Sequence, residues 1–349
     1  MEIRIYSQDM RFQGVSENQT SISWHRRYFE PGDFQIHAPI TPENIKLYQL
    51  GNLVWLQGAA EAGVIEDIRL EESNKRNKII AKGRFLESYM DRRILHDKVN
   101  FSGYTEVGMR NLLSNLSHPI PYVYLGELQG FTEEVSFQVT WKNLLDYETK
   151  LATESNLGYR FRPSFTERKI YFEVYKGLDR TRSQHVRSFT EFSDGYDNIN
   201  SATFTVNDQL EKTVAYVAGE GEGSERIVVL VGDTESTGYT RRELYVDAKD
   251  ITSDDLTEAQ YKEKLRQRGK EKLNENMKST SLECVTIPLG NFNYKKEYDL
   301  GDIVTTRKNN WGVGADMRIT EIEEIYEHGA MEVVPTLGNP LPTTLYMED

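Results

Sequence analysis

The chain has 349 residues, and its 42 Lys and Arg against 55 Asp and Glu give a formal net charge of −13, which disfavours a protein that coats nucleic acid. Hydrophobic residues make up 38% of the sequence, below the apolar content of about 45–50% usual for globular domains, but 11% aromatic residues argue against disorder, so we expect two or three folded domains with several small cores. The single cysteine, Cys284, excludes an internal disulfide and a cysteine metal site, and no apolar run approaches the length of about 20 residues that a membrane helix needs.

The first hundred residues are predicted to be mostly β-strand. Apolar and polar residues alternate in several short runs, and turn residues such as Glu30-Pro31-Gly32-Asp33 separate them. The predicted strands are 21–25, 33–38, 53–56, 64–70 and 78–83. A polar hairpin tip is expected at Asn74–Asn77, and a helix is expected at Arg84–Leu95.

Residues 101–165 have a more helical pattern. Thr105–Leu116 carries apolar residues at helical spacing, which predicts a helix. A second helix is predicted to begin at the N-cap Thr140 and to run through Trp141–Leu151, and Asn156-Leu157-Gly158 closes it. Strands are predicted to follow at 159–162 and 169–175.

From residue 166 onward strands predominate, interrupted by one long helix at about 254–280. Thr257 and Gln260 form a capping box at its start. Its apolar stripe consists of Tyr261, Leu265, Leu273 and Met277. The opposite face carries Lys, Arg and Glu, and we expect it to be solvated unless a partner covers it. Strands are predicted at 201–206, 213–217 and 226–231 before the helix and within 281–349 after it.

An internal echo indicates that one small β-fold occurs twice. The first copy of the motif is Tyr48-Gln49-Leu50-Gly51-Asn52-Leu53-Val54, and the second is Tyr298-Asp299-Leu300-Gly301-Asp302-Ile303-Val304. The flanking segments correspond in the same order: 34–39 with 282–288, 65–68 with 319–322, and 79–83 with 331–338. A lone Leu-Gly-Asp turn is common in β-proteins, but matching elements in the same order favour a duplication.

Several motifs along the chain carry a family resemblance. They are Pro31-Gly32-Asp33-Phe34-Gln35-Ile36-His37-Ala38-Pro39, Tyr175-Lys176-Gly177-Leu178-Asp179-Arg180-Thr181, Phe189-Thr190-Glu191-Phe192, Ala218–Arg226, Arg266–Leu273 and Tyr298–Val304. In this order the chain resembles the hub proteins of siphophage tail tips, a family that also forms the N-terminal part of tail-associated lysins and is related to the central hub of contractile-tail baseplates. The resemblance covers essentially the whole chain. It departs at Leu178, where a polar residue or Arg is commoner, and at Thr190, where Ser is usual.

The resemblance implies a mainly β (α+β) chain with two tail-tube-like β-barrel domains and helical insertions. Residues 1–100 are then the first barrel, 101–165 an α/β middle segment, and 166–349 a second unit whose barrel strands lie at 281–349. It also implies a structural hub in which three chains form a ring of six quasi-equivalent barrels. Such a ring closes the tail tube, adapts its six-fold symmetry to a three-fold tip and lets DNA pass.

The partners of such a hub follow from the same resemblance. They are two further copies of the chain, the distal tail protein ring, the tape measure protein, and tip or receptor-binding proteins. DNA is expected only in transit through the lumen, and this chain is not expected to insert into a membrane. The protein is expected in the tail tip of the virion, after assembly in the cytoplasm of the bacterial host.

No residue pattern supports catalysis or a cofactor. Six histidines occur, but none forms a His-Glu-x-x-His or His-x-x-Glu-His pair, and no Gly-x-Ser-x-Gly elbow is present. Cys284 stands in an alternating strand and is expected to be a small buried hydrophobe. We therefore predict no catalytic residue, no cofactor-binding residue, no metal ligand, and a protein that is not an enzyme.

The charged and glycine-rich segments are interpreted as structural. The run Gly219–Gly223 lacks the Gly-Lys-Ser/Thr ending of a phosphate loop and contains Glu, which predicts a flexible β-turn. Arg180–Arg187 is interpreted as an internal or inter-subunit ion-pair network. Acidic pairs are expected on solvated faces, and on a lumen wall their charge would keep DNA from binding. The pairs are Glu71-Glu72, Glu133-Glu134, Asp254-Asp255 and Glu323-Glu324.

Two alternative functions stay open at this point. A cell-wall or carbohydrate-binding or hydrolytic tail module would draw stacking groups from 20 Tyr and 4 Trp and acid–base groups from the many carboxylates. The hub of a contractile injection system would share the same ring architecture.

Overall fold

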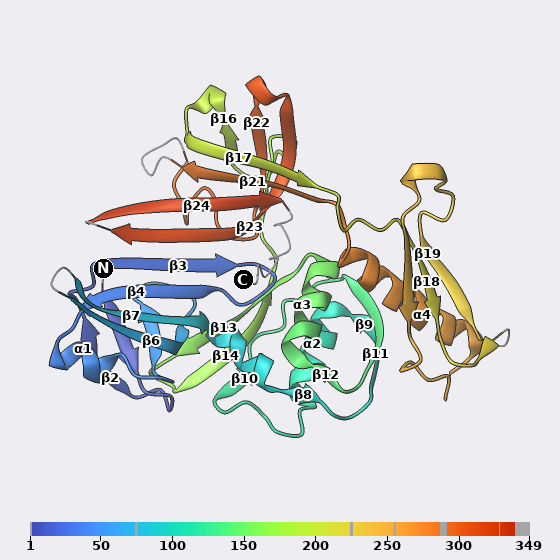
Figure 1. Ribbon diagram of the computed structural model, residues 1–349, viewed down its shortest axis with the longest axis horizontal. Coiled ribbons are helices and arrows are strands. Elements are labelled where there is room, and N and C mark those ends of the chain that lie inside the picture. The colour runs from blue at the N-terminus through green and yellow to red at the C-terminus, as the bar shows by residue number, and fades with distance from the viewer. Residues whose placement is uncertain are drawn as a thin grey trace.

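The computed structural model describes residues 2–73, 76–223, 226–254, 256–286, 292–327 and 329–338. The fold is mainly β, as predicted (Figure 1). In this part of the chain, none of the helices is long and apolar enough to cross a membrane.

The helices and strands form four groups: an N-terminal unit, a middle segment, a C-terminal unit and a lobe inserted into the C-terminal unit. The N-terminal unit consists of β1 (Ile3–Tyr6), β2 (Phe12–Ser16), β3 (Ser21–Arg27), β4 (Asp33–Pro39), α1 (Pro42–Leu47), β5 (Leu53–Leu56), β6 (Gly63–Ser73) and β7 (Arg76–Phe85). The middle segment consists of η1 (Leu86–Arg92), β8 (Ile94–Leu95), β9 (Val99–Tyr104), α2 (Thr105–Ser114), β10 (Val123–Leu125), β11 (Glu134–Val139), β12 (Lys142–Asn143), α3 (Leu144–Ser155), β13 (Gly158–Ser164) and β14 (Lys169–Tyr175). The C-terminal unit consists of β15 (Asp179–Arg180), β16 (Glu191–Ser193), β17 (Ile199–Asn207), β21 (Ser279–Thr286), β22 (Ile303–Lys308), β23 (Val313–Glu327) and β24 (Ala330–Gly338). A lobe inserted into it consists of β18 (Val214–Ala218), β19 (Val228–Gly232), β20 (Glu243–Asp247) and α4 (Glu258–Asn274).

One large open sheet runs through both units. Its main order is β17-β21-β24-β23-β3-β4-β7-β6-β5-β1-β2, and β22 joins it beside β23. Figure 1 shows the red C-terminal strands next to the blue N-terminal strands, with β23 beside β3 and the lobe standing apart from the sheet. Among the described residues no sheet closes on itself, because β17 and β2 end this one without meeting. The two barrels expected from the sequence are therefore not closed within one chain.

The described structure has four apolar clusters, which agrees with the several small cores expected. One surrounds Trp24 in the N-terminal unit, one surrounds Leu282 in the C-terminal unit, and one lies between α4 and the sheet of the lobe. The fourth combines residues of the N-terminal unit, such as Leu53, with the middle segment as far as Val174. The boundaries predicted for the three parts of the chain stay a prediction.

The helix predicted at Arg84–Leu95 is wrong in its type and start. Arg84 and Phe85 continue β7, where they pair with Val64 and Gly63 of β6. The chain then forms the 3-10 helix η1 instead of an α-helix. The strand partner therefore outweighs the helical spacing of the apolar residues.

The predicted N-cap Thr140 is also wrong. Helix α3 is capped by Asn143, whose side chain accepts a hydrogen bond from the N–H of Asp146. Thr140 instead donates its hydroxyl to the carbonyl of His96 at 3.0 Å, because β12 pairs with β8 just before the helix begins. The predicted end at Asn156 is confirmed, since this residue caps α3 in the left-handed conformation.

Helix α4 shows the capping box predicted at Thr257 and Gln260. Its charged face, expected to be solvated, is partly buried. Lys264 Nζ donates to the carbonyl of Phe137 at 2.9 Å, because α4 packs against β11 as well as against β18 and β19. The middle segment thus covers this face, and Met277, predicted on the apolar stripe, lies beyond the helix and is exposed.

Tyr28 lies where the two units meet the middle segment. Its ring is fully buried, and a Cβ added at Gly158 or Gly301 would lie 2.5 or 2.3 Å from the ring carbons. Its hydroxyl accepts a hydrogen bond from the N–H of Gly177 at 3.3 Å and lies 3.1 Å from the carbonyl oxygen of Asn156. Because Tyr28 follows β3 while Gly158 begins β13 and Gly301 precedes β22, this one side chain packs against three parts of the chain.

Two buried carboxyl groups lie where η1 and α3 contribute to the core of the middle segment. Glu87 Oε1 accepts a hydrogen bond from the N–H of Phe161 at 2.6 Å. Glu87 Oε2 and both carboxyl oxygens of Glu148 have no hydrogen-bond partner within the described ranges. Burial raises the pKa of Glu87 to about 8 and the pKa of Glu148 well above its usual value. Both groups therefore keep their protons to higher pH in the folded chain than in the unfolded chain.

Gly301→Ala is expected to lower the free energy of unfolding by at least about 3 kcal/mol. The φ of +89° is unfavourable for an L-residue, and the added methyl group collides with the buried ring of Tyr28. Gly312→Ala is the matched control, since Gly312 has a φ of +64° but an added Cβ meets no atom within 4 Å. Urea unfolding of both variants measures the difference. Equal losses would contradict the packing role of Gly301.

The stability of the chain is expected to fall as pH rises from about 4.5 to about 8, because the folded state holds a proton on Glu87 that the unfolded state releases. The slope attributable to one such group is up to about 1.4 kcal/mol per pH unit. Glu87→Gln, which keeps an oxygen for the N–H of Phe161, should flatten this decline in urea unfolding measured across that range. The exposed Glu127→Gln should leave the slope as it is. An unchanged slope in Glu87→Gln would show that this carboxyl group is not responsible.

Candidate assembly interface

The two copies of the Leu-Gly-polar motif form the same hydrogen-bonded turn. The N–H of Gly51 donates to the carbonyl of Ile65 at 2.9 Å, and the N–H of Gly301 donates to the carbonyl of Ile319 at 2.8 Å. The return bond, from each isoleucine N–H to the carbonyl of the residue after the glycine, is 2.9 Å in the first copy and 2.8 Å in the second. Both glycines have a positive φ, +84° and +89°, which favours glycine at these positions. The repeated sequence motif thus has the same backbone conformation in both copies.

The strands around the two turns also correspond in register. A β-bulge lies between Ile65 and Asp67 in β6 and between Ile319 and Glu321 in β23. Beyond the bulge, β6 pairs with β7 as β23 pairs with β24. Two further pairings, β3 with β4 and β17 with β21, extend the match outward. The N-terminal and C-terminal units therefore share one strand order.

The two units are joined where β23 pairs antiparallel with β3. Seven residue pairs form this joint, from Glu321 opposite Arg27 to Glu327 opposite Ser21. It uses the part of β23 beyond the bulge, whereas the part before the bulge pairs with β22. On this edge the bulge divides β23 between β22 of its own unit and β3 of the other unit, while the opposite edge stays paired with β24.

A buried ion-pair network supports the joint. Arg26 on β3 lies 2.8 Å from Glu61 and 2.6 Å from Asp299, and it donates to the hydroxyl of Tyr294 at 2.7 Å. Burial opposes the charge of Arg26, but the neighbouring Glu61 and Asp299 carboxylates hold the pKa of its guanidinium well above the usual value. Glu61 belongs to the N-terminal unit and Asp299 to the C-terminal unit, so this side chain bridges both.

A second set of charged contacts lies on the polar face of the joint. His25 Nε2 is 3.0 Å from Glu321, and Arg27 is 2.7 Å from Asp33 and 3.6 Å from Glu321. Burial alone raises the pKa of Glu321, but the hydrogen bond from His25 and the charge of Arg27 bring it below its usual value. The joint is therefore held by ionic contacts on both faces of the sheet.

Within the described ranges, the strand edges that correspond to the joined edges are unpaired. Residues 67–73 of β6 correspond to the part of β23 that pairs with β3, and residues 201–207 of β17 correspond to β3. In the described part of the chain, the first edge pairs with β7 alone and the second with β21 alone. Leu70 on the first edge is 56% exposed, and Val206 on the second is 49% exposed. Unpaired edges with exposed apolar side chains are surfaces on which another strand can add.

The arginine-rich motif singled out in the sequence forms internal ion pairs. Arg180 Nε donates to Asp302 of the second glycine turn at 2.7 Å, and the other carboxylate oxygen of Asp302 accepts from the N–H of Leu178 at 2.7 Å. Arg182 pairs with Glu191 at 3.1 Å. The internal version of the predicted network is therefore confirmed for these residues.

Of the residues screened for chemistry, His96 and His118 lie near each other, with ring centres 6.5 Å apart, whereas Cys284 belongs to the core of the C-terminal unit. Cys284 is buried, and burial raises the pKa of its thiol to about 12, which confirms the prediction of a small buried hydrophobe. His328 lies outside the described residues. Among the described residues no three His, Cys, Asp or Glu side chains are grouped so as to hold a metal ion. That the chain has no catalytic or cofactor-binding residue stays a prediction.

One member of an acidic pair, Glu324 of Glu323-Glu324, does not lie on a solvated face. Glu324 is buried, 3.0 Å from Lys295 and 2.7 Å from the hydroxyl of Tyr294, because the segment that carries these two residues covers this part of β23. Glu133 is bound to Lys176. Asp255 of another pair lies outside the described residues.

Sequence reasoning did not identify Arg26, Glu61 or the two unpaired edges. The repeated motif seen in the sequence extends outward only as far as β4 and its equivalent β21. The correspondence of β3 with β17 was therefore not recognised. The signal was present, since Ser21-Ile22-Ser23-Trp24 and Ser201-Ala202-Thr203-Phe204 both alternate and both carry an aromatic residue at the fourth position.

Comparisons with known proteins give one family and several similar folds. The model of the family described as Siphovirus ReqiPepy6 Gp37-like protein matches residues 2–339. No curated protein sequence matches.

Three solved structures illustrate the similarity of fold. The 43 kDa tail protein of prophage MuSo2 from Shewanella oneidensis is 14% identical, with a TM-score of 0.58 over 97% of this chain and 98% of its own. The tail protein from Neisseria meningitidis MC58 is 12% identical, with a TM-score of 0.61 over 97% and 96%. A chain of the Francisella PdpA–VgrG complex is 7% identical, with a TM-score of 0.50 over 97% of this chain and 52% of its own.

Arg26→Leu is expected to lower the free energy of unfolding by about 3–5 kcal/mol, because it leaves the buried carboxylate of Glu61 without its cation. Lys262→Leu is the control, since it removes a surface ion pair with Glu258 and should cost less than about 1 kcal/mol. Urea unfolding measures both. Similar small losses in the two variants would mean that the Arg26 network does not hold the joint.

Proposed function

The chain belongs to the Siphovirus ReqiPepy6 Gp37-like protein family, and on this premise we propose that it is the structural hub of a phage tail tip. Family membership and the tail-protein fold make it a structural component of a virion tail. The proposal adds that three copies form a ring at the end of the tail tube, that DNA passes through this ring, and that the hub itself catalyses no reaction.

One observation carries the proposal: β23 pairs with β3 inside the chain, whereas the equivalent edges of β6 and β17 have no partner among the described residues. We infer that β6 of one copy pairs with β17 of the next in the register of the internal joint. This register places Leu70 opposite Phe204, and Arg69 opposite Thr205. Pairing would cover Leu70 and complete the backbone hydrogen bonds of both edges.

Repetition of one joint produces a closed assembly. Each contact between chains would have the geometry of the contact within a chain, so successive units would be related by similar rotations. A head-to-tail contact of this kind closes into a ring when the rotations complete a full turn. Three chains then supply six units, and their open sheets together form the tube-like barrel that no single chain closes.

The polar face of the large sheet is proposed to line the passage. Apolar side chains on the other face fill the cores of the two units. Glu321, Glu323 and Glu327 of β23 lie on the polar face, with Lys78 and Lys82 of β7 on the same face of the neighbouring unit. Glu321 is already paired with Arg27, so Glu323 and Glu327 would repel the DNA backbone while Lys78 and Lys82 would attract it, and a face of mixed charge would bind a passing duplex weakly.

The remaining surfaces would serve the other tail proteins. We propose the distal tail protein ring above the hub, the tape measure protein at the lumen, and tip or receptor-binding proteins below. The similar fold in the PdpA–VgrG complex of Francisella supports a role for such a chain in contact with protein partners.

The register between chains can be tested by cross-linking. Arg69→Cys combined with Thr205→Cys is expected to give covalent trimers on oxidation, because opposite residues of antiparallel strands have Cα atoms about 4.5–5.5 Å apart, within disulfide range. Light scattering before oxidation, with the distal tail protein added if needed, measures the assembly, and non-reducing gels measure the cross-links. The buried thiol of Cys284 is not expected to react.

Arg69→Cys with Ser201→Cys is the matched control, on the same edges but four residues out of register. It should give no cross-link. Rings that cross-link equally in both pairs would contradict the register. A chain that stays monomeric with and without the distal tail protein would contradict the ring.

A further inference from the structure

The two glycine turns differ in what covers them. Leu300, in the turn of the C-terminal unit, is 5% exposed and belongs to the same apolar cluster as Tyr28. Leu50, at the equivalent position in the turn of the N-terminal unit, is 67% exposed. The leucine that is buried at one copy of the turn is therefore left in water at the other copy.

Tyr28 covers the turn of the C-terminal unit from across the internal joint. Its N–H donates to the carbonyl of Thr320 at 2.9 Å, which extends the pairing of β3 with β23 by one hydrogen bond. Its ring then lies on Gly301, where an added Cβ would be 2.3 Å from a ring carbon. The chain that leaves β3 thus covers the glycine turn next to it.

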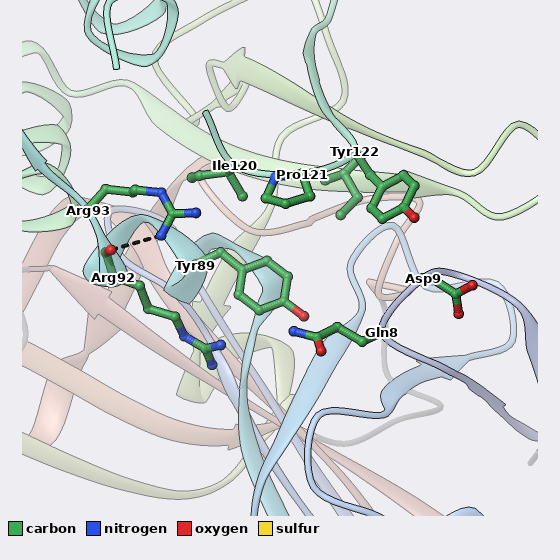
Figure 2. Close-up of a pocket in the computed structure, with 9 residues that line it drawn as sticks. Gln8, Asp9, Tyr89, Arg92, Arg93, Ile120, Pro121 and Tyr122 are labelled. Atoms are coloured by element: carbon green, nitrogen blue, oxygen red, sulfur yellow. Dashed lines mark hydrogen bonds between the residues drawn. The ribbon is translucent and has the colours of Figure 1, made fainter. Parts of the chain in front are cut away.

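The turn of the N-terminal unit has no such cover among the described residues. Apart from its chain neighbours, a Cβ placed on Gly51 would meet one atom within 4 Å, the Oε1 of Gln8 at 3.9 Å. Figure 2 shows the amide of Gln8 directed toward Tyr89, with which it lines a cavity. The place beside Gly51 that corresponds to the ring of Tyr28 is therefore open.

The proposed pairing of β6 with β17 brings a segment of a second copy to this place. In that register Asp208 takes the position of Tyr28, and its N–H would donate to the carbonyl of Glu66 of the neighbouring chain. The carboxylate of Asp208 is held by Arg242 of its own chain at 2.6 Å. In this assembly a side chain that covers Gly51 therefore comes from further along the segment.

Leu210 is the apolar residue that follows in this segment. The N–H of Glu211 donates to the carbonyl of Asp208 at 3.1 Å, which closes a turn and keeps Leu210 close to the end of the paired strands. The side chain of Leu210 is 49% exposed in the single chain. One copy thus offers an exposed leucine beside an open glycine, and the other offers an exposed leucine on a turn that the strand pairing brings to it.

We propose that Leu210 of one chain packs on Leu50 and Gly51 of its neighbour, in the place that corresponds to the packing of Tyr28 on Leu300 and Gly301 within a chain. The occupant of the open turn is then a second copy of this chain. The proposal rests on the ring proposed above and adds to it a contact outside the paired strands. Both leucines would leave water, and burial of apolar surface favours association.

Substitution of Leu50 tests the contact in a parent chain that carries Arg69→Cys and Thr205→Cys. Leu50→Asp is expected to raise the concentration at which half of the chains are assembled by at least about tenfold, because burying a leucine contributes more than the roughly 1.4 kcal/mol that corresponds to a tenfold change. Leu210→Lys combined with Leu50→Asp should recover part of this loss, since the two charges then attract each other across the contact. Light scattering of reduced samples, with the distal tail protein added if needed, measures the assembly.

Leu128→Asp is the matched control, because Leu128 is a similarly exposed leucine in the middle segment. It should leave the concentration needed for assembly unchanged. Leu50→Ala should show a smaller loss than Leu50→Asp in the same direction, and it replaces Leu50→Asp if that variant does not fold.

Oxidation of the same samples separates this contact from the ring. Unchanged assembly of Leu50→Asp, with the cross-link of Arg69→Cys to Thr205→Cys retained, would overturn the contact and leave the ring in place. Equal losses in Leu50→Asp and Leu128→Asp would also overturn the contact. A parent chain that stays monomeric and gives no cross-link would overturn the ring and the contact with it.

Discussion

The pairing of β23 with β3 is the contact on which the rest of the structure depends. It turns two similar units into one sheet, and its register is set by a bulge that follows each glycine turn. Beyond the bulge, the long strand of each unit stays paired with the return strand of its own unit, but its other edge is no longer paired with the preceding strand and becomes available to a neighbour. A chain with two such units can satisfy one of these strands internally. The other, and the edge that corresponds to its partner, must stay open or meet a second chain, because an unpaired strand edge in solution invites addition.

The joint is reinforced by residues whose burial costs free energy but whose removal would destabilise the fold. Arg26 brings a charge into the interior and is stabilised there by carboxylates from both units. Tyr28, two residues later, packs against glycines of the middle segment and of the C-terminal unit. The end of β3 therefore fixes both the angle between the units and the position of the middle segment. The large sheet and the middle segment are therefore packed together and do not form independent domains, although their apolar clusters are distinct.

Much of the fold follows from local patterns in the sequence. The alternating strands, the capping box at Thr257, the end of helix α3 at Asn156 and the echoed glycine turns are all found where they were predicted. The family match and the tail-protein folds likewise confirm the resemblance to phage tail hubs. The wrong predictions have tertiary causes. Arg84 and Phe85 pair with β6 and so belong to a strand, and the pairing of β12 with β8 moves the N-cap of α3 to Asn143. The middle segment packs on α4 and buries part of its charged face. The candidate interface was hidden for a related reason, because which edges are unpaired depends on the partners of every strand.

The internal joint and the proposed joint between chains differ in chemistry. In the alignment of the two units, Val206 takes the place of Arg26, and it would lie opposite Ile68. A ring of three chains would thus alternate two kinds of joint. The joint within each chain carries the Arg26 ion pairs and is also tied by the covalent chain. The joint between chains would carry apolar pairs on the core face, such as Leu70 opposite Phe204, and polar residues such as Arg69 on the other face. Under mechanical load such a ring would come apart into whole chains and not into single units, and salt would have little effect on the Arg26 ion pairs, because they are buried.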